Sequence, residues 1–128
     1  MQALTVVIMK IAEGVFNVSP KGSIDSDTYE ILQKKMDPMM RPTPKMIIFD
    51  MKEVEYISSM GLKAILDAKN KVESSGGALL LVNLQPQITK VFDIIKAIPS
   101  RNIFKSREEL DRYLIEIQRQ EIEKRKPA

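Results

Sequence analysis

The sequence predicts a single α/β domain, in which a mixed central sheet of about five strands has about four helices packed on it. The chain has 128 residues, a length at which one hydrophobic core is expected. Two continuous apolar runs, at residues 46–49 and 78–82, are typical of strands that are buried on both faces. Apolar residues at helical spacing follow these runs, so helices are expected to pack against the sheet.

The expected elements follow the order β-β-α-β-α-β-α-β-α. In chain order they are strands at residues 4–11 and 15–18, a helix through 29–36, a strand at 46–49, a helix through 62–72, a strand at 78–82, a helix through 86–95, a strand at 102–104 and a helix through 110–117. Asp27 and Glu30 have the spacing of a capping box, which predicts the start of the first helix. Ser106 and Glu109 repeat that spacing before the last helix. Residues 19–23 have the composition of a loop.

The end of the chain differs in character from the rest. The apolar stripe of the last helix fades after about Gln118, and charged residues dominate beyond it. We therefore expect the domain to occupy residues 1–118, with residues 119–128 forming a charged helix end or tail. The sequence leaves a homodimer open.

The composition excludes several kinds of active site. The chain has no cysteine and no histidine, which removes thiol catalysis, the commonest general base near neutral pH and the commonest transition-metal ligand. Asp25 and Asp50 could be considered for a metal site, but they lack the spacing of a cation-binding loop, so capping and loop hydrogen bonds are favoured. No glycine-rich phosphate loop is present. We expect neither an enzyme nor a bound metal or other cofactor.

Charge and hydropathy also limit the partners. The net charge is only +3, without the clustered basic footprint of a nucleic-acid-binding protein. The apolar residues 1–10 have no basic leader and no cleavage-like site, and no apolar stretch approaches the length of a membrane span. A cytoplasmic protein without a direct nucleic-acid or membrane partner is expected.

Residues 58–62, Ser-Ser-Met-Gly-Leu, open the second expected helix and are the strongest candidate for a functional segment. One serine hydroxyl, preferably that of Ser59, is expected to cap the helix. Gly61 lies in the first turn, where glycine costs about 1 kcal/mol of helix propensity relative to alanine. Either its backbone packs closely on a neighbour inside the domain or an outside partner approaches there. Leu62 is expected in the core.

Four segments in order give the chain a resemblance to a known family. They are residues 22–25, 48–57, 81–92 and 103–109, which are similar to the loop after the second strand, the central strand, the fourth strand with the third helix, and the final strand with its helix start. On these segments the chain resembles the STAS domain of the bacterial anti-sigma-factor antagonists.

The resemblance implies a non-enzymatic regulator that works by partner switching. In this family the unmodified antagonist binds an anti-sigma factor that is also a serine kinase, and phosphorylation of a Ser or Thr breaks the complex. The implied partner-binding residues are Gly22, Ile24, Asp25, Ser58, Ser59, Met60, Gly61 and Leu62. The family signature reads Asp-Ser-Ser-Gly or Asp-Ser-Thr-Gly, whereas Ser58 replaces its Asp here and Met60 replaces the hydroxyl residue before Gly61. Ser59 is therefore the implied phosphorylation site, with Ser58 as the second choice.

Two alternatives keep the same fold. The first is an interaction module without phosphoregulation, in which Met60 offers an adaptable apolar contact. The second is a domain that binds a small ligand or nucleotide and uses the helix start as an anion site.

Overall fold

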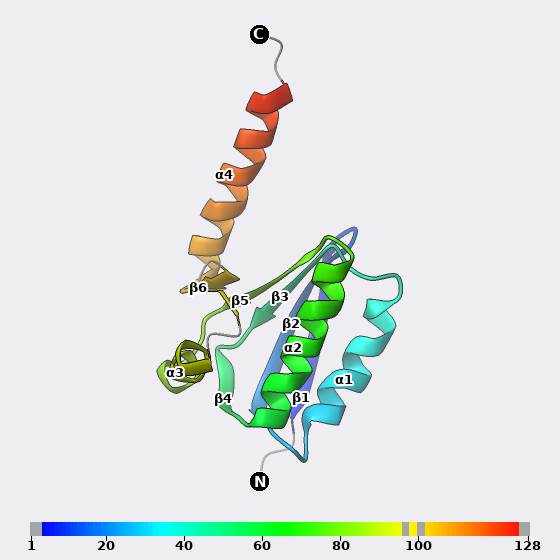
Figure 1. Ribbon diagram of the computed structural model, residues 1–128, viewed down its shortest axis with the longest axis vertical. Coiled ribbons are helices and arrows are strands. Elements are labelled where there is room, and N and C mark those ends of the chain that lie inside the picture. Colours follow the sequence, from blue (N-terminus) through cyan, green and yellow to red (C-terminus); the bar gives the residue numbers. More distant parts are fainter. Residues whose placement is uncertain (1–3, 96–97, 100–101, 126–128) are drawn as a thin grey trace.

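The computed structural model describes residues 4–95, 98–99 and 102–125 and confirms the α/β class, with helices against a mixed sheet (Figure 1). The strands are β1 (Thr5–Ala12), β2 (Val15–Ile24), β3 (Met46–Asp50), β4 (Glu53–Ile57), β5 (Ala78–Val82) and β6 (Ile103–Phe104). The helices are α1 (Tyr29–Met36), the 3-10 helix η1 (Asp37–Met40), α2 (Ser59–Ser74), α3 (Pro86–Ile95) and α4 (Arg107–Arg125).

The sheet is ordered β1-β2-β3-β5-β6, and β4 pairs with β2 beyond the end of β3. β1 is antiparallel to β2, and the other pairs are parallel. One strand more is present than the sequence pattern predicts. This strand is β4, in which Val54 and Ile57 are buried while Glu53, Glu55 and Tyr56 are exposed, so it lacks the apolar run that marks β3 and β5.

β2 is longer than predicted, because residues 19–23 continue the strand and the loop prediction there is wrong. β2 pairs with β3 through residues 15–18 and with β4 through residues 21–24. Pro20 lies between these two stretches, where β2 has left one partner and has not yet joined the next. A residue without an N–H donor fits this position, because no parallel partner requires its hydrogen bond.

α1 does not begin with the predicted capping box of Asp27 and Glu30. Its N-cap is Thr28, which makes no side-chain cap hydrogen bond. The Oδ1 of Asp25 instead accepts from the N–H of Asp27 at 2.9 Å and from that of Thr28 at 3.1 Å. Asp25 therefore caps the turn that leads into α1, whereas its favoured prediction was to cap the helix itself. At α4, the predicted cap is present, since Ser106 accepts from the N–H of Glu109 at 3.2 Å.

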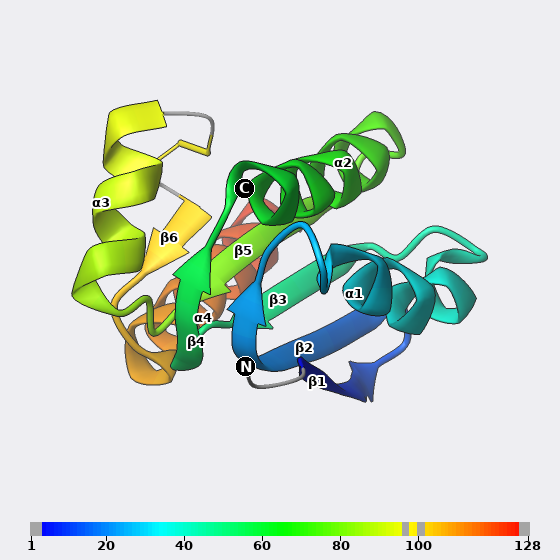
Figure 2. The same ribbon diagram turned by 90° about the horizontal axis from the view of Figure 1, so that it is seen from below.

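The two faces of the sheet carry separate apolar clusters. The larger cluster joins the sheet to α1, α2 and α3 and includes Phe49, Ile65 and Phe92, all almost fully buried. The smaller cluster lies on the opposite face, where Leu110 of α4 packs with Phe104 and neighbouring strand residues. Figure 2 shows α1 and α2 on one side of the sheet and α4 on the other.

α4 leaves the domain after its first turns. Leu110 is buried and Leu114 is half-buried, but the following described side chains are exposed. The helix continues through residues 119–125, which were expected to be a charged helix end or tail, and it projects away from the sheet (Figure 1). Residues 126–128 lie outside the described part of the chain.

Candidate functional site

Ser58, rather than Ser59, is the N-cap of α2. The backbone of Ser58 is extended, with φ −92° and ψ 176°, and its Oγ accepts from the N–H of Gly61 at 3.4 Å. Ser59 is the first helical residue, and its side chain is exposed. The preference for Ser59 as the cap is thus wrong, because the chain turns into the helix one residue earlier than the pattern indicated. This leaves the Ser59 hydroxyl accessible.

The structure decides between the two explanations for Gly61, which are close packing inside the domain and the approach of an outside partner. A Cβ at this position would lie 2.2 Å from the carbonyl oxygen of Ile24, at the end of β2. The same oxygen accepts the N–H of Ser58 at 2.9 Å. Glycine is therefore required by close packing inside the domain, and the segment 58–62 is seated on the end of β2.

The loop after β2 is held rigidly beside the start of α2. Thr28 donates its hydroxyl to the carbonyl of Ser23 at 2.7 Å and accepts the N–H of Asp25 at 2.9 Å. Thr28 is buried, and sequence reasoning missed its role. The sequence feature that could have predicted this role is the three-residue spacing of Asp25 and Thr28. This spacing allows each side chain to bond the backbone N–H of the other at a helix start. Figure 2 shows the connection from β2 to α1 beside the connection from β4 to α2.

Burial divides the eight predicted partner-binding residues into two groups. Four are buried and support the exposed part of the site: Gly22, Ile24, Gly61 and Leu62. Asp25, Ser58 and Met60 are partly exposed, and Ser59 is exposed. We call these four the rim residues. A docking partner would meet the rim residues directly and the other four only through the backbone they position.

Two further exposed side chains border the rim residues. Tyr56, two residues before the cap of α2, is 56% exposed and was not predicted as part of the site. Lys63 lies four residues after Ser59 on α2 and donates to Asp67 at 2.9 Å. This hydrogen bond and the charge of Asp67 raise the pKa of Lys63 above its ordinary value. The border of the site thus offers one exposed aromatic ring and one cation.

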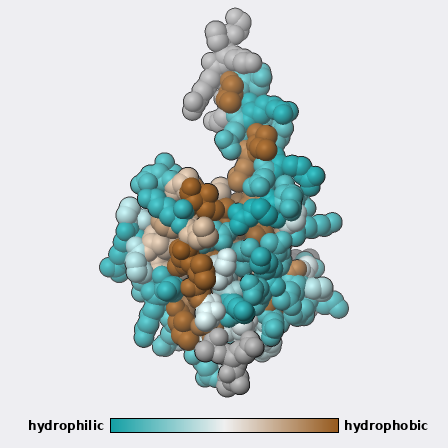
Figure 3. All heavy atoms as spheres, turned by 180° about the vertical axis from the view of Figure 1, so that it is seen from behind, coloured by the Kyte–Doolittle hydropathy of each residue, from teal (hydrophilic) through white to brown (hydrophobic). Residues whose placement is uncertain are grey.

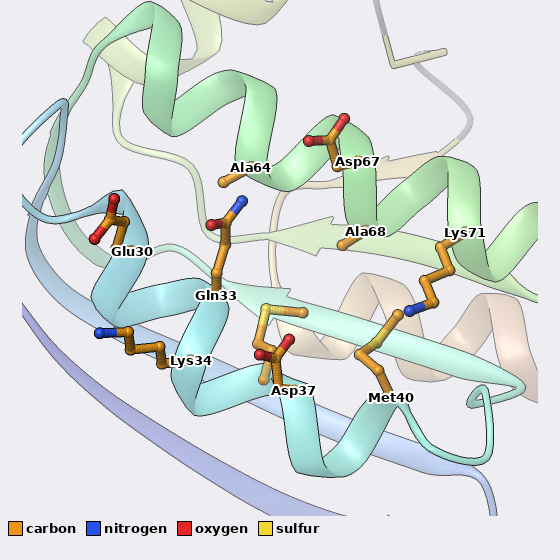
Figure 4. Close-up of a pocket in the computed structure, with 10 residues that line it drawn as sticks. Glu30, Gln33, Lys34, Asp37, Met40, Ala64, Asp67, Ala68 and Lys71 are labelled. Carbon is orange, nitrogen blue, oxygen red and sulfur yellow. The ribbon is translucent and has the colours of Figure 1, made fainter.

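A shallow groove of about 400 Å³ runs between α1 and α2, starting one turn beyond Gly61 (Figure 4). Ala64 and Ala68 of α2 leave the space, and Gln33 and Met40 line the other wall. Charged side chains of both signs surround it, so it does not select a ligand of one charge.

The two aspartates that were considered for a metal site make hydrogen bonds within the chain. Asp25 caps the loop before α1, and the Oδ1 of Asp50 accepts from the N–H of Lys52 at 3.2 Å and from Asn83 at 3.1 Å. Among residues 4–95, 98–99 and 102–125, acidic side chains form no group of three that could hold a metal ion. Within the same ranges, no helix is long and apolar enough to cross a membrane.

Comparison with known proteins places this fold in a family. Residues 7–110 match the model of the STAS domain family. The anti-sigma-B factor antagonist of Bacillus subtilis is 31% identical over 88 residues, which make up 69% of this chain and 80% of that protein.

Solved structures show the same fold in different settings. The anti-sigma factor antagonist SpoIIAA from Bacillus, in its unphosphorylated form, superposes with a TM-score of 0.69 at 18% identity, covering 88% of this chain and 98% of SpoIIAA. The murine anion transporter Slc26a9 superposes with a TM-score of 0.65 at 18% identity, covering 88% of this chain but 22% of the transporter. The fold alone therefore assigns no role, and the sequence relationship carries the assignment. The chain belongs to the STAS domain family and is a homologue of an anti-sigma factor antagonist.

Proposed function

We propose that this protein is an anti-sigma factor antagonist that binds a kinase-type anti-sigma factor through the rim residues Asp25, Ser58, Ser59 and Met60. The observation that carries the proposal is the exposure of these residues on a rigid base, where Gly61 packs on Ile24. A preformed surface loses little conformational entropy on docking, which favours affinity. The 31% identity to the Bacillus subtilis antagonist supports the same role.

Phosphorylation of Ser59 is the proposed control of this binding. Its hydroxyl is exposed, and within the described part of the chain it has no hydrogen-bond partner, whereas Ser58 is occupied as the cap of α2. The first turn of α2 contains no acidic residue. A phosphate there would meet the positive end of the helix dipole and lie four residues before Lys63, so the fold tolerates it.

The effect of the phosphate must then fall on the complex. Adding about two negative charges to the centre of a docking surface opposes any partner that desolvates that surface. SpoIIAA, whose fold this chain shares, has been solved in both unphosphorylated and phosphorylated forms, which supports control by phosphorylation in a protein of this fold.

A binding experiment tests the docking role. Isothermal titration of the full chain into a purified kinase-type anti-sigma factor from the same organism should give a one-to-one complex. Ser59→Asp should weaken it at least about tenfold, since a charge on a buried interface costs over about 1.4 kcal/mol. Asn70→Asp adds the same charge to an exposed position further along α2 and should leave the affinity unchanged. Equal loss in both variants would contradict docking at the rim residues.

A kinase assay separates the switched from the unswitched form of the proposal. With the anti-sigma factor and ATP, mass spectrometry of the wild-type chain should place phosphate on Ser59, and Ser59→Ala should abolish the label. The unswitched alternative is favoured by Met60, a partly exposed thioether at the position where the family signature has a hydroxyl. Binding without any phosphate on Ser58 or Ser59 would establish that alternative.

A further inference from the structure

A second pocket, of about 260 Å³, lies at the end of the sheet away from the rim residues. It is formed by the turn that joins β1 to β2 and by the connection from η1 to β3, whereas the rim residues lie beyond the other end of β2 (Figure 1). Among the described residues that line it, Lys10, Arg41 and Lys45 are cations and Glu13 is an acid. The lining therefore carries an excess of positive charge.

The segment 41–45, Arg-Pro-Thr-Pro-Lys, presents two of these cations on a stiff backbone. Proline fixes φ at about −65°, and the residue before a proline is restricted to extended conformations. Arg41 has this extended conformation, with φ −129° and ψ 104°. The segment therefore has little backbone freedom to lose when a ligand binds.

Lys45 is held in place by the turn before β2 and by the start of β5. Its N–H donates to the carbonyl of Gly14 at 2.8 Å, and its own carbonyl accepts the N–H of Ala78 at 3.0 Å. Its side-chain carbons lie over Gly14, where a Cβ would be 3.1 Å from the Cγ of Lys45. This packing limits the positions that the ammonium group can take.

Exposed charge is common on this protein and does not by itself mark a site. Seen from behind, hydrophilic side chains cover the surface on both sides of an apolar strip (Figure 3). The cations of the pocket differ because they have few acids to pair with. Lys10 bonds Glu13 at 2.8 Å, but no carboxylate of the described residues lies within ion-pair distance of Arg41. The hydrogen bond from Lys10 and the charges of Lys10 and Lys45 lower the pKa of Glu13, as a positive potential at the pocket requires.

The rest of the pocket offers a hydroxyl donor and an apolar wall. Thr43 is half-buried, and its hydroxyl makes no hydrogen bond with any of the described residues. Phe16 and Met39 form part of the lining. Guanidinium, ammonium and hydroxyl groups are donors that bind phosphate oxygens. The volume lies just below the range of about 300–1,000 Å³ that is usual for ligand pockets, so the pocket suits a small ligand.

We propose that this pocket binds the phosphate group of a small molecule, with Arg41, Thr43 and Lys45 donating to the phosphate oxygens. The phosphate is either free or carried as a monoester, whose organic part contacts Phe16 and Met39. Arg41 can donate two parallel N–H bonds to a phosphate, and Lys45 adds a point charge. The pocket and the rim residues lie at different ends of β2, so this site stands independently of the proposed function.

NMR titration of the full chain tests the proposal, because Thr43 and Lys45 each have a backbone N–H signal. Adenosine monophosphate should shift both signals saturably, whereas adenosine, which lacks the phosphate, should not. Inorganic phosphate separates the two sources of the group. Tighter binding of the nucleotide identifies a monoester as the ligand, and equal or tighter binding of inorganic phosphate identifies free phosphate.

Three results of this titration would overturn the proposal. The first is that neither phosphate compound gives a saturable shift. The second is that adenosine shifts the signals of Thr43 and Lys45 as much as adenosine monophosphate does. The third is that the shifts fall on Ser59 and Gly61 instead, which would place the anion at the start of α2.

Two variants and a matched control test which side chains bind. Arg41→Gln and Lys45→Met should each raise the Kd of the phosphate compound that binds more tightly at least about fivefold, since each removes a charged donor. Lys45→Met keeps the carbons that pack on Gly14, so the turn should remain folded. Lys52→Gln removes an exposed lysine just beyond the other end of β3 and should leave the Kd unchanged. An equal loss in all three variants would show attraction to the net charge alone and would contradict the site.

Discussion

The Cα of Gly61 lies so close to the carbonyl oxygen of Ile24 that a Cβ on residue 61 would be 2.2 Å from this oxygen. Real Cβ contacts are essentially never shorter than 3.0 Å, so only glycine allows the start of α2 to sit on the end of β2. The same carbonyl accepts the N–H of Ser58, and this contact therefore fixes the position of both serines.

Gly61→Ala is expected to destabilise the protein, against the usual direction of this change in a helix. Alanine normally gains about 1 kcal/mol over glycine inside a helix. Here the clash is with backbone, which cannot rotate away, so a net loss of about 1–3 kcal/mol in the free energy of unfolding is expected. Urea denaturation measures it. Asn70→Ala, at an exposed position of α2, serves as the control and should not destabilise. A Gly61→Ala variant as stable as the wild type would contradict the close packing.

Ser58→Asp is expected to stabilise α2. The first turn of the helix has no acidic residue, and an aspartate cap both accepts the N–H of Gly61 and offsets the helix dipole. The expected gain is about 0.3–1 kcal/mol at neutral pH. The dipole lowers the pKa of such a carboxylate, so the gain is present above its unfolded pKa and disappears as the pH falls through its folded pKa.

Thermal unfolding at several pH values checks this expectation. Ser74→Asp, at the other end of the same helix, is the matched control and should lose a few tenths of a kcal/mol, because the dipole has the opposite sign there. An equal effect of both aspartates would show that the gain does not come from the helix start.

Strands could be predicted from the sequence where burial alone determines the order of apolar and polar residues. β3 and β5 are buried on both faces, and their continuous apolar runs identify them. β4 was not predicted, because only Val54 and Ile57 are buried in a strand of mostly exposed residues. The full length of β2 was not predicted, because residues 19–23 have the composition of a loop. Pairing with β1 and β4, which are distant contacts in part, holds these residues in a strand despite their composition.

The candidate site was predictable as a region but not atom by atom. Residues 22–25 and 58–62 are far apart in the sequence, and the resemblance joined them before the contact between Ile24 and Gly61 was known. Which serine caps α2 depends on one backbone torsion, and two adjacent hydroxyl residues give the same local signal. The reciprocal bonds between Thr28 and Asp25 follow a spacing that the sequence contains, but the bond from Thr28 to the carbonyl of Ser23 in β2 is one that capping patterns do not include.

Asp67→Asn should change the titration of Lys63. The hydrogen bond and charge of Asp67 raise the pKa of Lys63 in the folded protein, so this variant should lower it. Because the folded pKa is the higher one, the pair's contribution to stability is present below the unfolded pKa and disappears as the pH rises through the folded pKa. NMR titration of the Lys63 side chain measures the shift. Asp93→Asn, on α3, should leave the titration unchanged.

Thr28→Val should loosen the loop that carries Asp25 without changing the volume of the side chain. The substitution removes the hydroxyl that donates to the carbonyl of Ser23 and accepts the N–H of Asp25. Thr28 is only 6% exposed, so water cannot readily replace either bond, and a loss of about 1–3 kcal/mol in unfolding free energy is expected. Thr28→Ser keeps the hydroxyl and is the matched control. Amide hydrogen exchange gives a local readout, because the N–H of Asp25 should exchange faster in Thr28→Val and at the wild-type rate in Thr28→Ser. Unchanged exchange at Asp25 in both variants would show that this hydroxyl does not hold the loop beside α2.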